Sequence, residues 1–144
     1  MNHKELILKA SRWLKKHSNN TIIPNCSTIA TEIVCANATG EIPDVIGWCY
    51  WTSVLIEVKV SRSDFKRDAR KIFREYQDMG MGEFRYYICP TDLIKLNELP
   101  PHWGLLYYSK DWGIKIIQKA ERQQANLQSE RTLLLSLLRR KNKK

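Results

Sequence analysis

Hydrophobic positions along the chain follow a helical period at first and then occur in short strand-like runs. Apolar side chains at positions 6, 7, 10, 13 and 14 predict an amphipathic helix over residues 3–17. Later runs rich in β-branched and aromatic residues predict strands at residues 28–36, 44–50, 53–60, 84–89, 103–109 and 114–119. The strands at 44–50 and 53–60 are close enough in sequence to pair as a hairpin.

Two further helices are predicted from capping residues and apolar spacing. Ser63 is the expected N-cap of a helix that ends at Gly80 or Gly82. Its buried face is expected to contain Phe65, Ala69, Ile72, Phe73 and Tyr76. The leucine-rich residues 121–140 predict a last helix, which runs into the basic sequence RRKNKK. Helices and strands together indicate an α/β protein.

The composition is that of an ordinary globular protein. Of 144 residues, 43% are hydrophobic and 27% are charged, which fits a single domain over residues 1–144. We expect its core over about residues 3–118, with the last helix and the basic tail over 119–144. The chain lacks an apolar run of roughly 18 residues and a signal-peptide start, so we expect a cytoplasmic protein without a membrane partner. The four cysteines lack zinc-finger spacing and are expected to be reduced packing residues.

The charge is basic and unevenly distributed. The net charge is +9, with 24 Lys and Arg against 15 Asp and Glu. Residues 1–17 and 62–74 each carry +4, and residues 119–144 carry +6, so the rest of the chain is mildly acidic. Basic blocks around an acidic centre fit a protein that holds a polyanion, and nucleic acid is the expected partner. A basic surface that serves solubility alone is the alternative.

Three charged residues lie in or beside predicted strands where apolar residues are expected. In the sequence VLIEVKV, alternation places Glu57 and Lys59 on the same face. The preceding strand opens with Pro43 and Asp44, so that Asp44 can approach this face if the strands are neighbours. Two carboxylates at the end of an apolar sheet repel one another unless a cation compensates them, and oxygen ligands favour Mg²⁺ or Mn²⁺. An ordinary exposed Glu/Lys pair is the alternative.

The order of these motifs resembles the PD-(D/E)xK nuclease superfamily. The motifs are PD at 43–44 and IEVK at 56–59, within the order helix, strand, strand, strand, helix, strand over roughly residues 3–90. The segment EVKVSRSDFKRD, the tyrosine in FREYQDM and the later GLLYY look more specifically like MmcB-type proteins linked to bacterial DNA repair. The resemblance implies a restriction endonuclease-like core with a central mixed sheet flanked by helices.

The resemblance also implies roles for individual residues. Asp44 and Glu57, with the backbone carbonyl of Val58, would hold the metal, and Lys59 would orient the attacking water and stabilise negative charge. The superfamily commonly has a further acidic residue upstream. Glu32 is preferred for this role, because Glu5 is expected on the solvent face of the first helix.

Residues after Lys59 offer support and substrate contacts. Ser61 and Asp64 are expected either to support the site or to cap the next helix. Basic residues of that helix are candidate phosphate contacts: Arg62, Lys66, Arg67, Arg70 and Lys71. Near the hairpin turn, Trp48, Tyr50 and Trp51 are candidates for stacking on unpaired bases, although packing under the turn is the favoured interpretation.

The sequence thus predicts a nuclease that requires Mg²⁺ or Mn²⁺ and hydrolyses phosphodiester bonds, with DNA the expected substrate in repair or recombination. The alternative is a non-catalytic nucleic-acid-binding module on the same fold. The retained set Asp44, Glu57 and Lys59 favours the enzyme. The last helix offers a phosphate clamp or a homodimer contact. The choice of DNA or RNA, and of endonuclease or exonuclease action, stays open.

Overall fold

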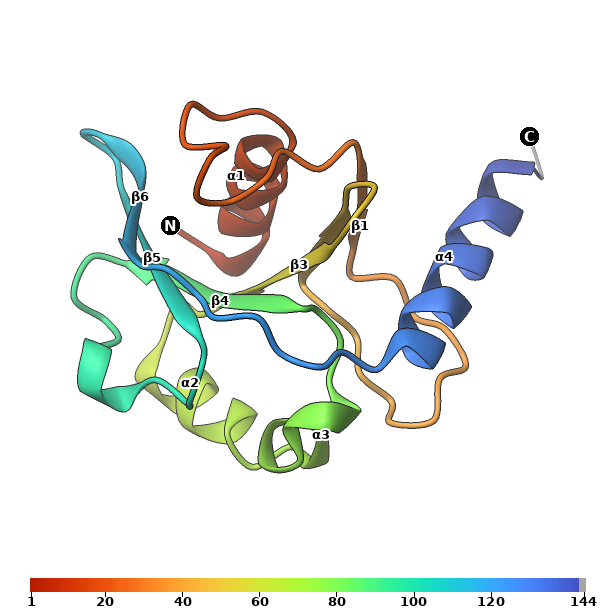
Figure 1. Ribbon diagram of the computed structural model, residues 1–144. Helices are drawn as coiled ribbons and strands as arrows, with labels where there is room; N and C mark the ends of the chain where they lie inside the picture. The colour runs from red at the N-terminus through yellow and green to blue at the C-terminus, as the bar shows by residue number, and fades with distance from the viewer. Residues whose placement is uncertain (143–144) are drawn as a thin grey trace.

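Six strands form one mixed sheet in the order in which they occur along the chain (Figure 1). A computed structural model describes residues 1–142. The strands are β1 (Thr28–Thr31), β2 (Val45–Trp48), β3 (Ser53–Val58), β4 (Phe84–Pro90), β5 (Gly104–Ser109) and β6 (Gly113–Gln118). The β3–β4 and β4–β5 pairs are parallel, and the other neighbouring pairs are antiparallel. All six predicted strands are confirmed, with shorter bounds for several.

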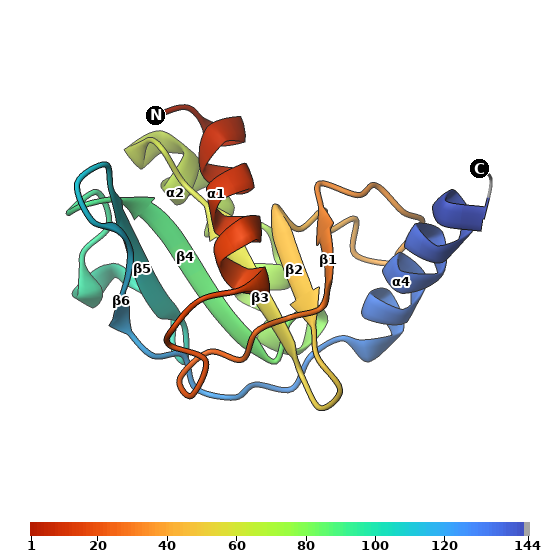
Figure 2. The ribbon, with the colours of Figure 1, turned by 90° about the horizontal axis from the view of Figure 1, so that it is seen from above.

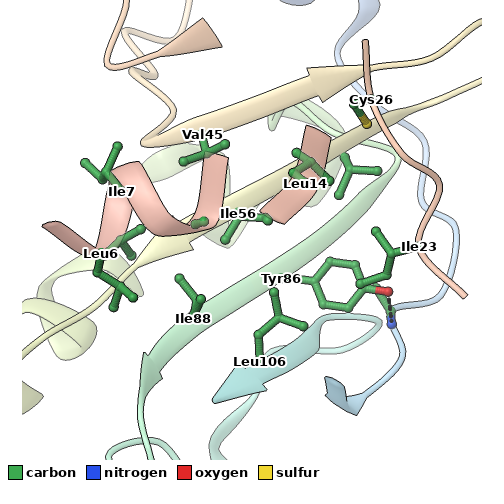
Figure 3. Close-up of a cluster of buried hydrophobic side chains, with 14 residues drawn as sticks. Leu6, Ile7, Leu14, Ile23, Cys26, Val45, Ile56, Tyr86, Ile88 and Leu106 are labelled. Atoms are coloured by element: carbon green, nitrogen blue, oxygen red, sulfur yellow. Dashed lines mark hydrogen bonds between the residues drawn. The ribbon is translucent and has the colours of Figure 1, made fainter. Parts of the chain in front are cut away.

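Helix α1 (His3–Lys15) covers one face of the sheet (Figure 2). It begins with a capping box in which the Asn2 side chain accepts from Glu5 N and the Glu5 side chain accepts from Asn2 N. The buried stripe of α1 packs on alternate residues of β2, β3 and β4, as Figure 3 shows, and this cluster includes Leu6, Leu14, Val45, Ile56, Tyr86 and Ile88. The Tyr86 hydroxyl accepts from Ala120 N at 3.0 Å, which attaches the segment after β6 to this core.

The opposite face carries short helices where one long helix was predicted. Helix α2 (Arg62–Asp68) is followed by α3 (Ile72–Glu75) and the 3₁₀ turn η1 (Gln77–Met79). Lys71 has an extended backbone (φ −69°, ψ 144°), and this break rotates the following turn. Phe65 and Phe73 of the predicted apolar face are buried as expected, whereas Ala69, Ile72 and Tyr76 are exposed. Arg74 is buried beside Phe73 instead.

The start of α2 also differs from the prediction. Ser61, and not Ser63, is the N-cap, and its hydroxyl accepts from Asp64 N at 3.2 Å. The reason is that β3 ends at Val58, so the chain turns into the helix two residues earlier than expected. Ser61 has the extended conformation that an N-cap requires (φ −144°, ψ 155°).

The last helix is shorter than predicted and lies beside β1 at the edge of the sheet (Figure 1). Residues 121–126 are not helical, and α4 runs from Leu127 to Asn142. The buried carboxylate of Glu130 attaches α4 to the sheet, since it accepts from Trp48 Nε1, Ser53 Oγ and Gly82 N. Lys143 and Lys144 of the predicted basic tail lie outside the described residues.

The structure therefore confirms an α/β fold with a mixed sheet flanked by helices and a C-terminal helix. A 3₁₀ turn, η2 (Leu96–Glu98), lies between β4 and β5. Cys26, Cys35, Cys49 and Cys89 are free, and two of them are buried. Within residues 1–142, no helix has both the length and the apolar character needed to cross a membrane.

Candidate metal and nucleic-acid site

Strand directions bring Asp44, Glu57 and Lys59 to one edge of the sheet. Glu57 is near the carboxyl end of β3, and Lys59 follows that strand directly. Asp44 precedes β2, which runs antiparallel to β3, so the two positions face each other across the hairpin. The Asp44 Oδ2 atom accepts from Val58 N at 2.8 Å, and Asp44 N lies 3.5 Å from Glu57 Oε1. We call this end of the sheet the carboxyl edge, because β3, β4 and β5 all end there.

His3 lies beside Asp44, a contact that sequence reasoning missed. Its Nε2 atom is 3.4 Å from Asp44 Oδ2, and its Nδ1 atom is 4.0 Å from Glu32 Oε1. Each of the three side chains offers one ligand atom, and these atoms lie within 4.8 Å of one another. The sequence offered no signal for His3, because a histidine at the start of an amphipathic helix is unremarkable until the helix is placed on the sheet.

Glu32 lies just after β1 rather than within it. Its backbone is left-handed (φ 49°), and its N–H group donates to the carbonyl oxygens of Pro43 and Asp44. The side chain is 48% exposed and turns toward His3. Glu5, the other upstream candidate, serves the capping box of α1. The structure thus brings Glu32, and not Glu5, together with Asp44.

Glu57 is buried at the centre of the carboxyl edge. Burial and, to a lesser degree, the neighbouring Asp44 carboxylate raise its pKa to about 8, against the lowering effect of Arg74. Burial likewise raises the pKa of Asp44. The Arg74 Nη2 atom lies 3.3 Å from Glu57 Oε1. Two adjacent carboxyl groups therefore share a region where the ionised form of each is disfavoured.

Arg74 contacts three buried carboxylates, Glu57 among them. The prediction of one unbroken helix after β3 could not reveal these contacts. Besides Glu57, Arg74 contacts Glu41 Oε2 at 3.0 Å and Asp68 Oδ2 at 2.8 Å, and Asp68 also accepts from the Tyr87 hydroxyl. The nearby cations Arg74 and Lys59 hold the pKa of Asp68 at about 2, against the effect of burial. Asp68 and Arg74 stand six positions apart in sequence, and only the break at Lys71 allows both to point inward.

Lys59 connects this network to a surface pocket. Its ammonium lies 3.4 Å from Asp68 Oδ1 and 4.0 Å from Glu57 Oε2, while only 7% of the residue is exposed. The pocket has a volume of about 320 Å³, and its lining consists of His3, Val58, Lys59, Asp64, Arg67, Asp68 and Lys71. Lys59 is therefore a buried cation that faces an opening large enough for a phosphate group.

The basic residues of the α2 region differ in whether they already pair with an acidic side chain. All five predicted phosphate contacts are exposed, namely Arg62, Lys66, Arg67, Arg70 and Lys71. Arg62 pairs with Glu98 at 2.5 Å, Arg67 pairs with Asp64, and Lys71 lies 3.4 Å from Asp68. Among residues 1–142, Lys66 and Arg70 form no salt bridge, so they can meet phosphates without breaking one.

The other predicted positions have structural explanations or lie far from the site. Ser61 caps α2, and Asp64 lines the pocket while its carboxylate is paired with Arg67. Trp48 packs under the hairpin turn and donates to Glu130 at 3.0 Å. Tyr50 and Trp51 are exposed at the β2–β3 turn, which lies at the end of the sheet opposite the carboxyl edge (Figure 2).

The side chains at the carboxyl edge fit a divalent cation. Asp44 and Glu32 offer carboxylate oxygens, which suit Mg²⁺ and Mn²⁺, and His3 offers an imidazole nitrogen, which suits a transition metal better than Mg²⁺. Glu57 and the main chain of Val58 are adjacent to Asp44. Mutual repulsion of the Asp44 and Glu57 carboxyl groups is the physical feature that a bound cation would relieve.

Comparisons with known proteins bear on the fold alone. No protein-family profile matches the chain, and no curated protein matches it. The solved structure of SPO1766, described as a protein of unknown function from Silicibacter pomeroyi, superimposes with a TM-score of 0.57 at 23% sequence identity. The match covers 78% of this chain and 75% of that protein. The chain thus shares its fold with a bacterial protein of unknown function.

Proposed function

We propose that this protein is a metal-dependent nuclease that hydrolyses phosphodiester bonds, with DNA as the expected substrate. The supporting observation is that two antiparallel strands bring Asp44, Glu57 and Lys59 together at one end of the sheet, where Lys59 lines a surface pocket. A buried ammonium beside two carboxyl groups with raised pKa values is costly for stability, and such groups gather at functional sites. The same set carries the resemblance to the PD-(D/E)xK superfamily.

In this proposal the residues at the carboxyl edge have different roles. Asp44 and Glu57, with the Val58 carbonyl, would hold the metal, and Glu32 and His3 lie within reach of the same cation. A bound Mg²⁺ or Mn²⁺ supplies Lewis-acid polarisation of the phosphate and lowers the pKa of a coordinated water. The Val58 N–H group fixes the orientation of Asp44, and Arg74 fixes that of Glu57.

Lys59 acts on the substrate rather than on the metal. Its ammonium faces the pocket, where it can orient the attacking water and stabilise the negative charge that develops on the phosphorane. Asp68 and Glu57 keep this ammonium in place from the side of the core. Lys66 and Arg70 offer phosphate contacts that position a substrate without reading its sequence.

A specific observation favours a second candidate, a nucleic-acid-binding module without catalysis. Glu57 and Lys59 also belong to the buried network of Arg74 and Asp68. Removing one member of such a network is destabilising, so the chain would retain these residues for stability alone. In that case the protein binds nucleic acid through its basic residues and leaves phosphodiester bonds intact.

Cleavage assays distinguish the two candidates. Labelled single-stranded, duplex, flapped and four-way DNA, together with RNA, should be incubated with Mg²⁺, with Mn²⁺ or with EDTA. The nuclease proposal expects cleavage of at least one substrate with Mg²⁺ or Mn²⁺ and none with EDTA. Binding to the same substrates without any cleavage would favour the module instead. Lys59→Met protein serves as the control for a contaminating nuclease.

A further inference from the structure

The turn between β5 and β6 lies at the same end of the sheet as the candidate site. Because β5 runs parallel to β3 and β4, its last residue, Ser109, reaches the carboxyl edge. Antiparallel β6 starts there at Gly113. Figure 2 places this turn, the start of α1 and α2 along one side of the molecule, with the β2–β3 turn on the opposite side.

This turn presents an aromatic ring together with basic groups. Trp112 is 39% exposed although it is the largest kind of apolar side chain, and Lys115 Nζ lies 4.3 Å from the centroid of its ring. The turn also contains the exposed Lys110. On the α1 face of the sheet, the Lys9 ammonium lies 5.5 Å from the centroid of the Tyr108 ring in β5.

The charge and geometry of this surface favour a nucleic-acid strand as its occupant. Lys110 and Lys115 outnumber the one acidic residue of the turn, Asp111, so the surface carries a net positive charge that complements phosphates. An exposed indole stacks on a base of any type, provided that the base is unpaired. From β2 to β5 there are three strand spacings, so the turn lies roughly 14 Å along the edge from Asp44.

We propose that Trp112, Lys115 and Lys110 form a second contact surface for the substrate, on which an unpaired base stacks while the lysines contact phosphates. This inference rests on the proposed function and narrows its substrate class to nucleic acid with a single-stranded segment. A strand that runs along the carboxyl edge touches both the pocket of Lys59 and the β5–β6 turn. A fully paired duplex has no free base for the indole and gains only the phosphate contacts.

The chain provides a matched control on the opposite side of the molecule. Trp51 in the β2–β3 turn is 60% exposed, and the Arg122 guanidinium lies 5.6 Å from the centroid of its ring. Trp51 is therefore the same kind of side chain as Trp112 and likewise lies beside a basic group, a guanidinium in place of an ammonium. Because Trp51 lies away from the carboxyl edge, it should not contact a strand bound at the pocket.

Fluorescence anisotropy with labelled single-stranded and duplex oligonucleotides tests the inference, in EDTA to prevent cleavage. Trp112→Ala should weaken single-strand binding by about 5- to 100-fold, the range for losing one stacked base, and change duplex binding less than about twofold. Trp112→Phe should retain most of the affinity, since it keeps an aromatic ring. Trp51→Ala should bind both oligonucleotides as the wild type does.

The other possible results show whether the second contact surface alone fails or the proposed function fails with it. If Trp112→Ala binds single strands as tightly as the wild type, the second contact surface is refuted, while wild-type binding and cleavage leave the proposed function standing. Equal losses in Trp112→Ala and Trp51→Ala, or equal losses on single strands and duplex, also refute it. A wild-type protein that binds no nucleic acid overturns the proposed function and this inference together.

Discussion

At the scale of single residues, a substitution of Lys59 should affect phosphodiester cleavage far more than nucleic-acid binding. In the proposed mechanism its ammonium contacts the water and the transition state and does not bind the metal. Lys59→Met keeps the apolar stem and removes the charge, so cleavage should fall by about a hundredfold or more. Affinity for nucleic acid should fall by less than about tenfold, because one phosphate contact among several is lost. Single-turnover cleavage and anisotropy measure the two effects.

A double variant extends this test. Glu57→Gln combined with Lys59→Met should be little worse in cleavage than either single change, because residues that act as one unit are not additive. The melting temperature of each variant must be measured alongside, since Lys59 also pairs with the buried Asp68. Wild-type cleavage rates in Lys59→Met would make this lysine a structural residue and remove the centre of the nuclease proposal.

Glu57 gives the metal-free protein an unusual dependence of stability on pH. Its pKa is about 8 in the folded protein and 4.5 ordinarily, so between these values the folded state binds more protons than the unfolded state. The contribution is fully present below pH 4.5 and is lost as the pH rises toward 8. Raising the pH from 6 to 8 in EDTA should therefore cost on the order of 2 kcal/mol in the free energy of unfolding.

Urea unfolding at the two pH values measures this slope, and Glu57→Gln is the control. Glutamine keeps the shape of the side chain but cannot titrate, so its stability should change much less between pH 6 and pH 8. Asp68 does not affect the slope between pH 6 and pH 8. Its pKa is lowered in the folded protein, so its contribution to stability is lost only as the pH falls below 3.8. Equal slopes for the wild type and Glu57→Gln would show that Glu57 is ionised in the folded protein at neutral pH.

At the scale of elements, the α2 region should determine how steeply nucleic-acid binding depends on salt. Lys66 and Arg70 are exposed and free of salt bridges among residues 1–142, so they are the best candidates for phosphate contacts. The double change to alanine should weaken binding and reduce the slope of log affinity against log salt by roughly 0.9 for each lost duplex contact. Anisotropy titrations at several salt concentrations provide the slope.

Helix α1 supplies a control with the same change in charge. Lys15 and Lys16 are exposed at the end of α1, whereas the start of α1 contacts Asp44 through His3. Lys15→Ala with Lys16→Ala removes two positive charges away from the carboxyl edge and should leave the slope nearly unchanged. Identical slopes for the two double variants would mean that net charge alone matters and that α2 is not in the interface.

The attachment of α4 should depend on one carboxylate. Glu130→Ala leaves the donors Trp48 Nε1, Ser53 Oγ and Gly82 N without their acceptor, which should cost roughly 2–3 kcal/mol of stability. Hydrogen exchange should become faster in α4 than in β4. Glu121→Ala is the control, because Glu121 is exposed and its loss should change stability by less than about 0.5 kcal/mol. A stable Glu130→Ala protein with protected α4 amides would contradict this account.

At the scale of the whole molecule, a bound cation should stabilise the fold. A ligand that binds only the folded state adds stability by mass action, so Mg²⁺ or Mn²⁺ at ten times its Kd should raise the melting temperature by roughly 3–6 °C. Asp44→Asn should abolish this gain, whereas Asp78→Asn, at an exposed acid away from the carboxyl edge, should retain it. Scanning fluorimetry measures the shift. A wild-type melting curve unaffected by millimolar Mg²⁺, Mn²⁺ and Ca²⁺ would refute the site.

Much of the fold was predictable because its strands and first helix have strong local patterns. The apolar spacing of α1, the β-branched run of β3 and the aromatic run of β4 are each visible within a single segment. Strand alternation also placed Glu57 and Lys59 on one face, and the short hairpin brought Asp44 to them. Wrong boundaries occur where a neighbouring segment decides the conformation, as at Lys71, where the extended backbone between α2 and α3 lets Arg74 reach buried carboxylates.

The sequence by itself determined the α/β class, the order of the elements and the trio Asp44, Glu57 and Lys59, because short-range periodicity carries that information. Only the tertiary structure decided what surrounds the trio. His3 reaches Asp44 because α1 packs with its first turn at the carboxyl edge, and Arg74 reaches Glu57 because the predicted helix is broken. Such contacts join residues far apart in sequence, and their energies depend on burial and mutual charge, which no local pattern encodes.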